Sequence, residues 1–298
     1  MKRLYFIGIF LVTATLAQAA EMSGESHFHL LTARCESEIR EGAESTPQSP
    51  PLNVDDPSTP GCNVWEINVV VDGDLTREQR TLETPLLDIN YGIGDNIQLK
   101  YELPYVSDRS QGTGVSAVGE SKAGVKYMFF EDEQTKLQFA AYPQLTFVQT
   151  SADAVKQGLA TPGTIITLPV LMARKIGETT RGDVVATANL GFNISTKPDT
   201  ANFLSASVGV GTPILRRVSI MGELATEQAM VMIADEARAK IVKAGVGIIG
   251  TINDQFLIFG SFGHSLSTSD SYDHTYGLVG FRLLAGGVSP SRLAATEH

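Results

Sequence analysis

The sequence predicts an all-β protein, an antiparallel up-and-down transmembrane β-barrel that follows an N-terminal leader. Three observations support this fold class. The chain opens with a targeting segment, it then repeats segments of alternating polar and apolar residues, and the turns between these segments alternate between short and long. Short turns at one end and long loops at the other are typical of outer-membrane barrels, and the count of segments favours about twelve strands, within a range of about ten to fourteen.

Residues 1–19 have the pattern of a secretory signal peptide. Lys2 and Arg3 give a charged start, residues 4–16 form an apolar run, and a small-x-small cleavage signal ends at Ala19. The apolar run is too short to cross a bilayer as a helix. We therefore expect export and removal of this segment, and we expect the remaining chain to cross lipid as a closed barrel.

Composition narrows the function. The formal net charge is −10, and removal of Lys2 and Arg3 with the signal peptide makes it −12. A chain this acidic lacks the basic patch that nucleic-acid binding needs. We expect no cofactor, no metal site and no catalytic residues. A lipid-cleaving barrel needs a base within reach of a serine, and the adjacent His264 and Ser265 point to opposite faces of a strand.

Residues 20–63 are expected to form a periplasmic leader with a proline-rich linker. From the sequence this leader either hangs in the periplasm or folds up into the barrel mouth. It carries Cys35 and Cys62, the two cysteines of the chain. In an oxidising compartment we expect them to form a disulfide. Its loop of about 28 residues gives a chain-entropy contribution of roughly 3–4 kcal/mol. Two unpaired thiols are the alternative.

The barrel is expected over residues 64–284. In its first strand the apolar Trp65 and Ile67 alternate with the polar Glu66 and Asn68. The apolar set is expected to face lipid and the polar set the lumen. The other expected strands are 84–91, 96–105, 120–130, 136–147, 165–176, 183–194, 203–211, 217–228, 238–250, 255–265 and 274–284.

The connections between these strands fall into the two length classes. Short turns are expected at residues 92–96, 131–134, 212–216 and 253–254. Long loops are expected at 72–83, 105–118, 148–161 and 195–202. An even strand number places both barrel ends on the periplasmic side, with a polar tail at 285–298. Residues 165–176 and 242–249 alternate poorly, and the glycines at 245, 247 and 250 are interpreted as permitting barrel curvature.

The early strands carry the candidate site. A tight turn at residues 92–96 that places Asn90 opposite Gln98 also places Asp88 opposite Lys100, an opposite-charge pair. The residues expected to line the lumen are Glu66, Asn68, Asp88, Asn90, Gln98, Lys100, Glu102, Lys122 and Lys126. Two interpretations stay open: these groups line a solute path, or they form an ion-pair network that closes a narrow barrel.

The sequence resembles the family of outer-membrane transporters named for the meta-pathway of phenol degradation. The resemblance is carried by residues 51–61, 65–68, 83–105, 124–127 and 142–145. The resemblance implies a signal-bearing barrel that helps the uptake of aromatic or other hydrophobic compounds, without a cofactor or catalytic residues. Asp88, Asn90, Gln98, Lys100 and Glu102 match the family motif. Cys62 does not belong to it.

The expected function is therefore a passive transporter or channel for small solutes in the outer membrane of a Gram-negative cell. Its expected partners are outer-membrane lipid, a small-molecule solute and the outer-membrane assembly machinery. A non-transporting structural or interaction barrel is the alternative, and a barrel lipid hydrolase is less favoured because no His-x-Ser pair occurs in the expected barrel.

Overall fold

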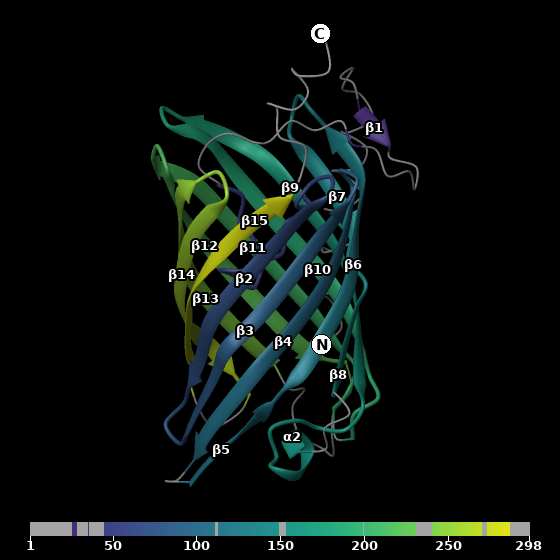
Figure 1. Cartoon of the computed structure of the whole chain (residues 1–298), viewed down its shortest axis with the longest axis vertical. Helices are drawn as coiled ribbons and strands as arrows, with labels where there is room; N and C mark the ends of the chain where they lie inside the picture. The colour runs from purple at the N-terminus through teal and green to yellow at the C-terminus, as the bar shows by residue number, and fades with distance from the viewer. Residues whose placement is uncertain are drawn as a thin grey trace, which may run out of the picture.

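The computed structural model describes residues 26–28, 35, 45–110, 113–148, 153–198, 200–230, 240–269 and 273–286. These residues form a closed, antiparallel barrel of 12 strands with two extra strands (Figure 1), which confirms the predicted fold class. The expected signal peptide and nearly all of the expected C-terminal tail lie outside the described residues.

The wall is built from neighbouring strands in chain order. Its strands are β2 (Val64–Leu75), β3 (Gln79–Ile93), β4 (Ile97–Ser110), β6 (Glu120–Asp132), β7 (Leu137–Ala141), β8 (Gln144–Val148), β9 (Thr164–Thr179), β10 (Gly182–Ser195), β11 (Phe203–Leu215), β12 (Val218–Ala229), β13 (Lys240–Asn253), β14 (Phe256–Thr268) and β15 (Thr275–Gly286). The barrel closes where β15 pairs with β2.

Some elements are accessory to this ring. β7 and β8 are the two halves of one wall strand, which is interrupted at Tyr142 and Pro143, and both halves pair with β6 and β9. β5 (Thr113–Val118) extends the hairpin of β4, β1 (Ser26–Phe28) pairs with the end of β6, and α2 (Asp153–Lys156) is a short helix.

The two ends of the barrel differ. One end, here called the turn end, carries the tight turns at residues 94–96, 133–136, 180–181, 216–217 and 254–255. The opposite end, here called the loop end, carries β5 and α2 at the bottom of Figure 1. The wall starts at Val64 and finishes at Gly286, both at the turn end, as an even strand number requires.

The prediction of long loops at residues 72–83 and 105–118 was wrong in extent. β2 continues to Leu75 and β3 starts at Gln79, so residues 76–78 alone connect them. The alternation persists here because carboxylates such as Asp72 and Glu83 remain on the inner side. The wall therefore projects as strands at the loop end, where the sequence analysis expected long loops.

The outer surface is apolar. Leu190, Val208 and Val279 are 60%, 53% and 61% exposed, and each alternates with more buried residues on its strand. A closed wall with an outward apolar band is the arrangement that spans lipid as a barrel. None of the helices among the described residues has the length and apolar character needed to cross a membrane.

We expect Val208→Lys to lower the free energy of unfolding by roughly 2–4 kcal/mol, because it places a charge on the lipid face far from both ends of β11. Urea titration in lipid vesicles measures this. The control is Gln228→Lys, at an exposed position next to the loop end of the neighbouring β12, with an expected cost of about 0–1 kcal/mol. Equal costs at both positions would contradict a lipid-facing Val208.

The described part of the leader lies inside the barrel, which decides between the two placements that the sequence left open. Leu52 and Val54 are buried in a core cluster with Val70, Met221 and Ile249 of the wall. Burial of two such side chains stabilises this arrangement by roughly 1.5–3 kcal/mol each. This cluster also explains the poor alternation of residues 242–249, since Ile248 faces outward while its neighbour Ile249 faces the leader.

Candidate functional site

A polar network covers the inner wall of β2, β3 and β4 at the positions that the sequence analysis selected. Asn68 Nδ2 donates to Glu66 Oε1 at 3.0 Å and to Asp88 Oδ2 at 3.2 Å. Asn90 Nδ2 donates to Glu66 Oε1 at 3.3 Å and to Asp88 Oδ1 at 3.2 Å. Gln98 extends the chain of contacts by donating to Asn90 Oδ1 at 2.6 Å.

The expected register of the hairpin between β3 and β4 was wrong by two residues. Asn90 pairs with Lys100 and Asp88 pairs with Glu102, because β3 continues to Ile93 and the turn is confined to residues 94–96. Gly94 supports this turn with a φ of 66°. Lys100 still reaches Asp88 along the diagonal, and the opposite charges therefore meet despite the shift.

Charges of both signs continue along the wall toward the loop end. Lys100 Nζ lies 3.3 Å from Asp88 Oδ1 and 3.0 Å from Glu102 Oε2. Lys122 Nζ, on β6, lies 3.3 Å from Glu102 Oε1 and has a 36% exposed side chain. The network thus runs from a fully buried region to one that is open to solvent.

Sequence reasoning missed Arg282, which joins the network from β15. Its Nε donates to Asn68 Oδ1 at 2.9 Å, and it lies 3.5 Å from Glu66 Oε1. The sequence signal that could have identified it is a single arginine between the apolar Phe281 and Leu283. One charged residue in an otherwise apolar strand is expected to face the lumen rather than lipid. Glu223 on β12 was missed as well, and it lies between Gly222 and Leu224 with a second carboxylate at Glu227.

Lys126 differs from the other predicted residues, because its amine binds the leader. Its Nζ donates to the backbone oxygens of Asp56 at 2.7 Å and Ser58 at 3.1 Å. It also lies 4.9 Å from the centre of the Tyr142 ring. Burial raises the pKa of the nearby Asp55 carboxyl above its usual value, against the opposing charges of Lys100 and Lys126.

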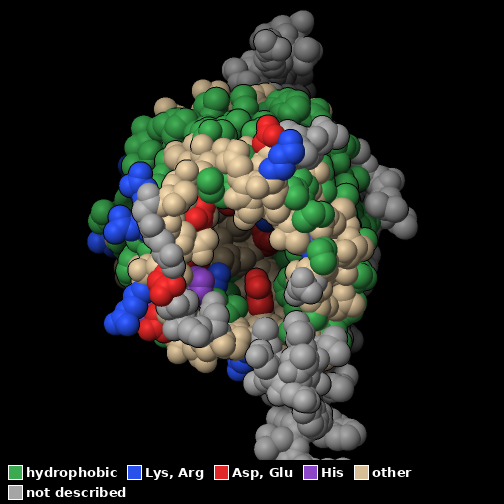
Figure 2. All heavy atoms as spheres, turned by 90° about the horizontal axis from the view of Figure 1, so that it is seen from below, with side chains coloured by type: hydrophobic (Ala, Val, Ile, Leu, Met, Phe, Trp, Pro, Cys, Tyr) green, Lys and Arg blue, Asp and Glu red, His purple; other side chains and the backbone are tan. Residues whose placement is uncertain are grey.

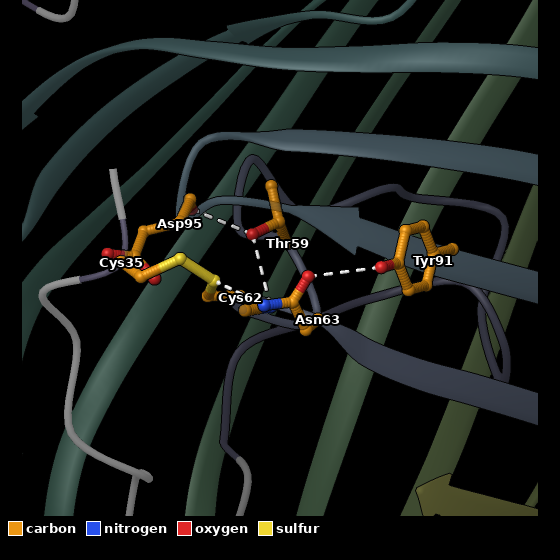
Figure 3. Close-up of a disulfide and its surroundings, with 7 residues drawn as sticks. Cys35, Thr59, Cys62, Asn63, Tyr91 and Asp95 are labelled. Carbon is orange, nitrogen blue, oxygen red and sulfur yellow. Dashed lines mark hydrogen bonds between the residues drawn. A yellow bond between two sulfur atoms is a disulfide. The ribbon is translucent and has the colours of Figure 1, made fainter. Parts of the chain in front are cut away.

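The disulfide that the sequence predicted between Cys35 and Cys62 is confirmed (Figure 3). It lies at the turn end, directly before β2. There Thr59 Oγ1 donates to the backbone oxygen of Asp95 at 2.8 Å. The bond therefore closes residues 36–61 into a loop whose two ends meet at the turn end of the barrel.

We expect Cys35 and Cys62 to resist maleimide labelling in the unfolded protein until a reductant is added. Complete labelling without reductant would contradict the bond. The Cys62→Ser variant serves as the control, since it leaves Cys35 free to react in both conditions.

The loop end is hollowed (Figure 2), and charged side chains surround the opening. One cavity of about 330 Å³ lies between Thr81, Glu83, Val106 and Glu120 of the wall and residues 158–161. A second cavity of about 160 Å³ shares Thr81 and Glu83, and its further lining residues are Asn53, Asp72, Gly73, Asp74, Lys243 and Tyr276. We call these two cavities the vestibule. Asn53 belongs to the leader, which therefore forms part of the vestibule floor.

The histidines of β14 and its following loop lie at the same end. His264 Nδ1 is 3.0 Å from Thr275 Oγ1, and His274 Nδ1 is 3.0 Å from Asp74 Oδ1. Ser265 Oγ accepts the backbone N–H of His274 at 2.8 Å. Within the part of the chain that the structure describes, no group of three or more His, Cys, Asp and Glu side chains is arranged to hold a metal ion.

The closed antiparallel wall with its outward apolar band defines the fold class, which is that of outer-membrane β-barrels. The structure is similar to the COG4313 outer membrane channel from Pseudomonas putida F1, with a TM-score of 0.66, 12% sequence identity, and coverage of 78% of this chain and 100% of that chain. It is also similar to the NanC porin, with a TM-score of 0.52, 8% identity, and coverage of 73% and 98%. At these identities the likeness concerns the fold alone. No protein-family model and no curated protein matches the sequence.

Proposed function

We propose that this protein is an exported outer-membrane channel for small solutes, with its turn end in the periplasm and its loop end outside the cell. The observation that carries the proposal is the enclosed wall of opposite charges, which leads from the open vestibule to Arg282 in the interior. Charged groups inside a barrel are costly to desolvate. A wall that keeps many of them is better suited to solvated solutes than to a structural core.

The class of solute is a narrower proposal. The motif at residues 83–105 resembles that of transporters linked to phenol degradation, and this favours aromatic compounds. The vestibule combines the ring of Tyr276 and the apolar Val106 with Glu83 and Lys243. Such a lining favours small aromatic solutes that carry polar or charged substituents. The proposed role of Lys100, Glu102 and the other network residues is to line the route of these solutes.

A non-transporting barrel remains the second candidate, because one observation favours it. The leader fills the turn half of the lumen and packs Leu52 and Val54 against the wall. A permanently filled lumen would suit a structural or interaction protein. The missing base–nucleophile spacing in the sequence leaves a hydrolase without support, and we propose no enzymatic activity.

Fractionation and conductance test the proposal together. We expect the protein in the outer-membrane fraction, as a compact band on a gel that shifts after boiling. In planar bilayers we expect discrete openings, and in liposomes we expect faster swelling with small aromatic carboxylates than with disaccharides. A folded, inserted protein that stays solute-tight, both as wild type and with the leader released as described below, would contradict the channel.

A further inference from the structure

The leader backbone is held by side chains of the wall over residues 50–58. Glu223 accepts the backbone N–H groups of Asn53 at 2.8 Å and Val54 at 3.1 Å, and it accepts Asn53 Nδ2 at 2.6 Å. Asn189 accepts the N–H of Asp55 at 2.7 Å and donates to its oxygen at 2.7 Å. These contacts replace the ladder hydrogen bonds that an irregular buried segment lacks.

Two cationic side chains on other strands of the wall also hold the leader. Arg282 donates to Gln48 Oε1 at 2.5 Å and to the backbone oxygen of Pro50 at 3.3 Å. Lys126 donates to the backbone oxygens of Asp56 and Ser58. The segment is therefore held from β6, β10, β12 and β15, on different sides of the lumen. Most of these contacts recognise peptide groups rather than particular side chains.

The apolar lining of the turn half is shaped for the same segment. Met221, Ile249 and Phe259 face inward, where a water-filled channel would expose them, and they are only 2–4% exposed because Leu52 and Val54 lie over them. Leu52 and Val54 enter one cluster although residues 49–54 form a turn and bends, in which the N–H of Leu52 donates to the backbone oxygen of Gln48 at 3.0 Å.

Glycines on the inner side of the wall leave space for the leader segment. A Cβ atom at Gly209 would lie 2.8 Å from Pro47 Cβ and 3.0 Å from Val54 Cγ1, and one at Gly247 would lie 3.0 Å from Leu52 Cδ2. The sequence analysis interpreted Gly247 as a curvature residue, and the structure shows this close approach to the leader. Any larger residue here would displace the segment or the wall.

We propose that the turn half of the lumen is a binding site for an irregular, proline-rich peptide, and that residues 45–58 are its resident ligand. The ligand class is a turn-forming, proline-rich chain with apolar side chains two residues apart and peptide groups that are not paired in a helix or sheet. Bound, the segment closes the solute route, so this proposal rests on the proposed channel function. Because the Cys35–Cys62 bond and the Thr59–Asp95 contact hold the loop at the turn end, the segment leaves toward that end and stays tethered.

The test uses the full chain with Leu52→Asp and Val54→Asp, which remove the apolar anchors but leave the wall unchanged. We expect at least a tenfold rise in open time in planar bilayers. A synthetic peptide of residues 45–58, added from the turn end, is expected to restore the block. The control is the same peptide with the two aspartates, which should leave the open time unchanged.

A fluorescent form of the wild-type peptide separates the two proposals. Its binding to the double variant is measured by fluorescence anisotropy. Saturable binding without any conductance in planar bilayers supports the peptide site and contradicts the channel function. Conductance that neither peptide changes, without saturable binding, overturns the peptide site. Should the double variant fail to fold, Asn189→Leu, which removes both hydrogen bonds to Asp55, takes its place with the same expected direction. If that variant has wild-type open times and binds no peptide, the proposal of a peptide site is also contradicted.

Discussion

Replacing Lys100 by methionine is expected to lower the free energy of unfolding by about 3–5 kcal/mol, because it strands buried carboxylates without a counter-charge. Lys100 Nζ lies within 3.3 Å of Asp88 and 3.0 Å of Glu102, and its side chain is 7% exposed. Urea unfolding in lipid vesicles measures the change. Trp65, the single tryptophan of the chain, is a natural fluorescence reporter because it lies in β2 beside this network.

The controls separate stranded charge from lost packing. Lys122→Met removes a half-exposed partner of Glu102 and is expected to cost less than about 1 kcal/mol. Adding Asp88→Asn to Lys100→Met should recover part of the loss, because it removes one of the two stranded charges. A Lys100→Met protein as stable as the wild type would show that the network contributes little to the fold.

Replacing Gly209 by valine is expected to displace the leader from its site in the lumen and to raise the channel open time about tenfold or more. A Cβ atom at this position would already contact Pro47 and Val54, and the two methyl groups of valine extend further into the lumen. Valine itself suits a strand. The barrel wall should therefore still form, and the heat-shift of the folded band on a gel checks that it does.

The matched control is Gly222→Val, on the neighbouring strand. A Cβ atom at Gly222 has 3.9 Å to its nearest neighbour, the backbone oxygen of Gly245, and does not approach the leader. We expect wild-type conductance from this variant. If both glycine variants behave alike, the contact between Gly209 and the leader has no part in closing the channel.

The sequence was sufficient to predict the barrel because lipid imposes a period of two on every strand. Every wall strand was predicted, with ends up to five residues from the observed ones, and Glu66, Asn68, Asp88 and Lys100 form a polar network on the inside of the wall. The register of β3 against β4 was wrong since it depends on where the turn at Gly94 begins, and one glycine-rich stretch permits more than one turn.

The inner apolar cluster could not be predicted in the same way. Met221, Ile249 and Phe259 face the lumen only because the leader covers them, and the leader is distant in sequence from β12, β13 and β14. A rule that assigns polar residues to the lumen therefore fails wherever another part of the chain fills it. The weak alternation of residues 242–249 results from this packing. The sequence alone did not indicate which segment covers these inward apolar residues.

Oxidative cross-linking between Pro47→Cys and Gly209→Cys, with Cys35 and Cys62 replaced by serine, tests the location of the leader most directly. The Cβ positions of residues 47 and 209 lie 2.8 Å apart, so a shift of about 1 Å reaches the spacing of a disulfide. We expect mass spectrometry of the membrane-inserted protein to find the linked peptides, and none when Gly222→Cys replaces Gly209→Cys. Two introduced thiols that stay unlinked and label freely would place the leader outside the lumen and contradict the account.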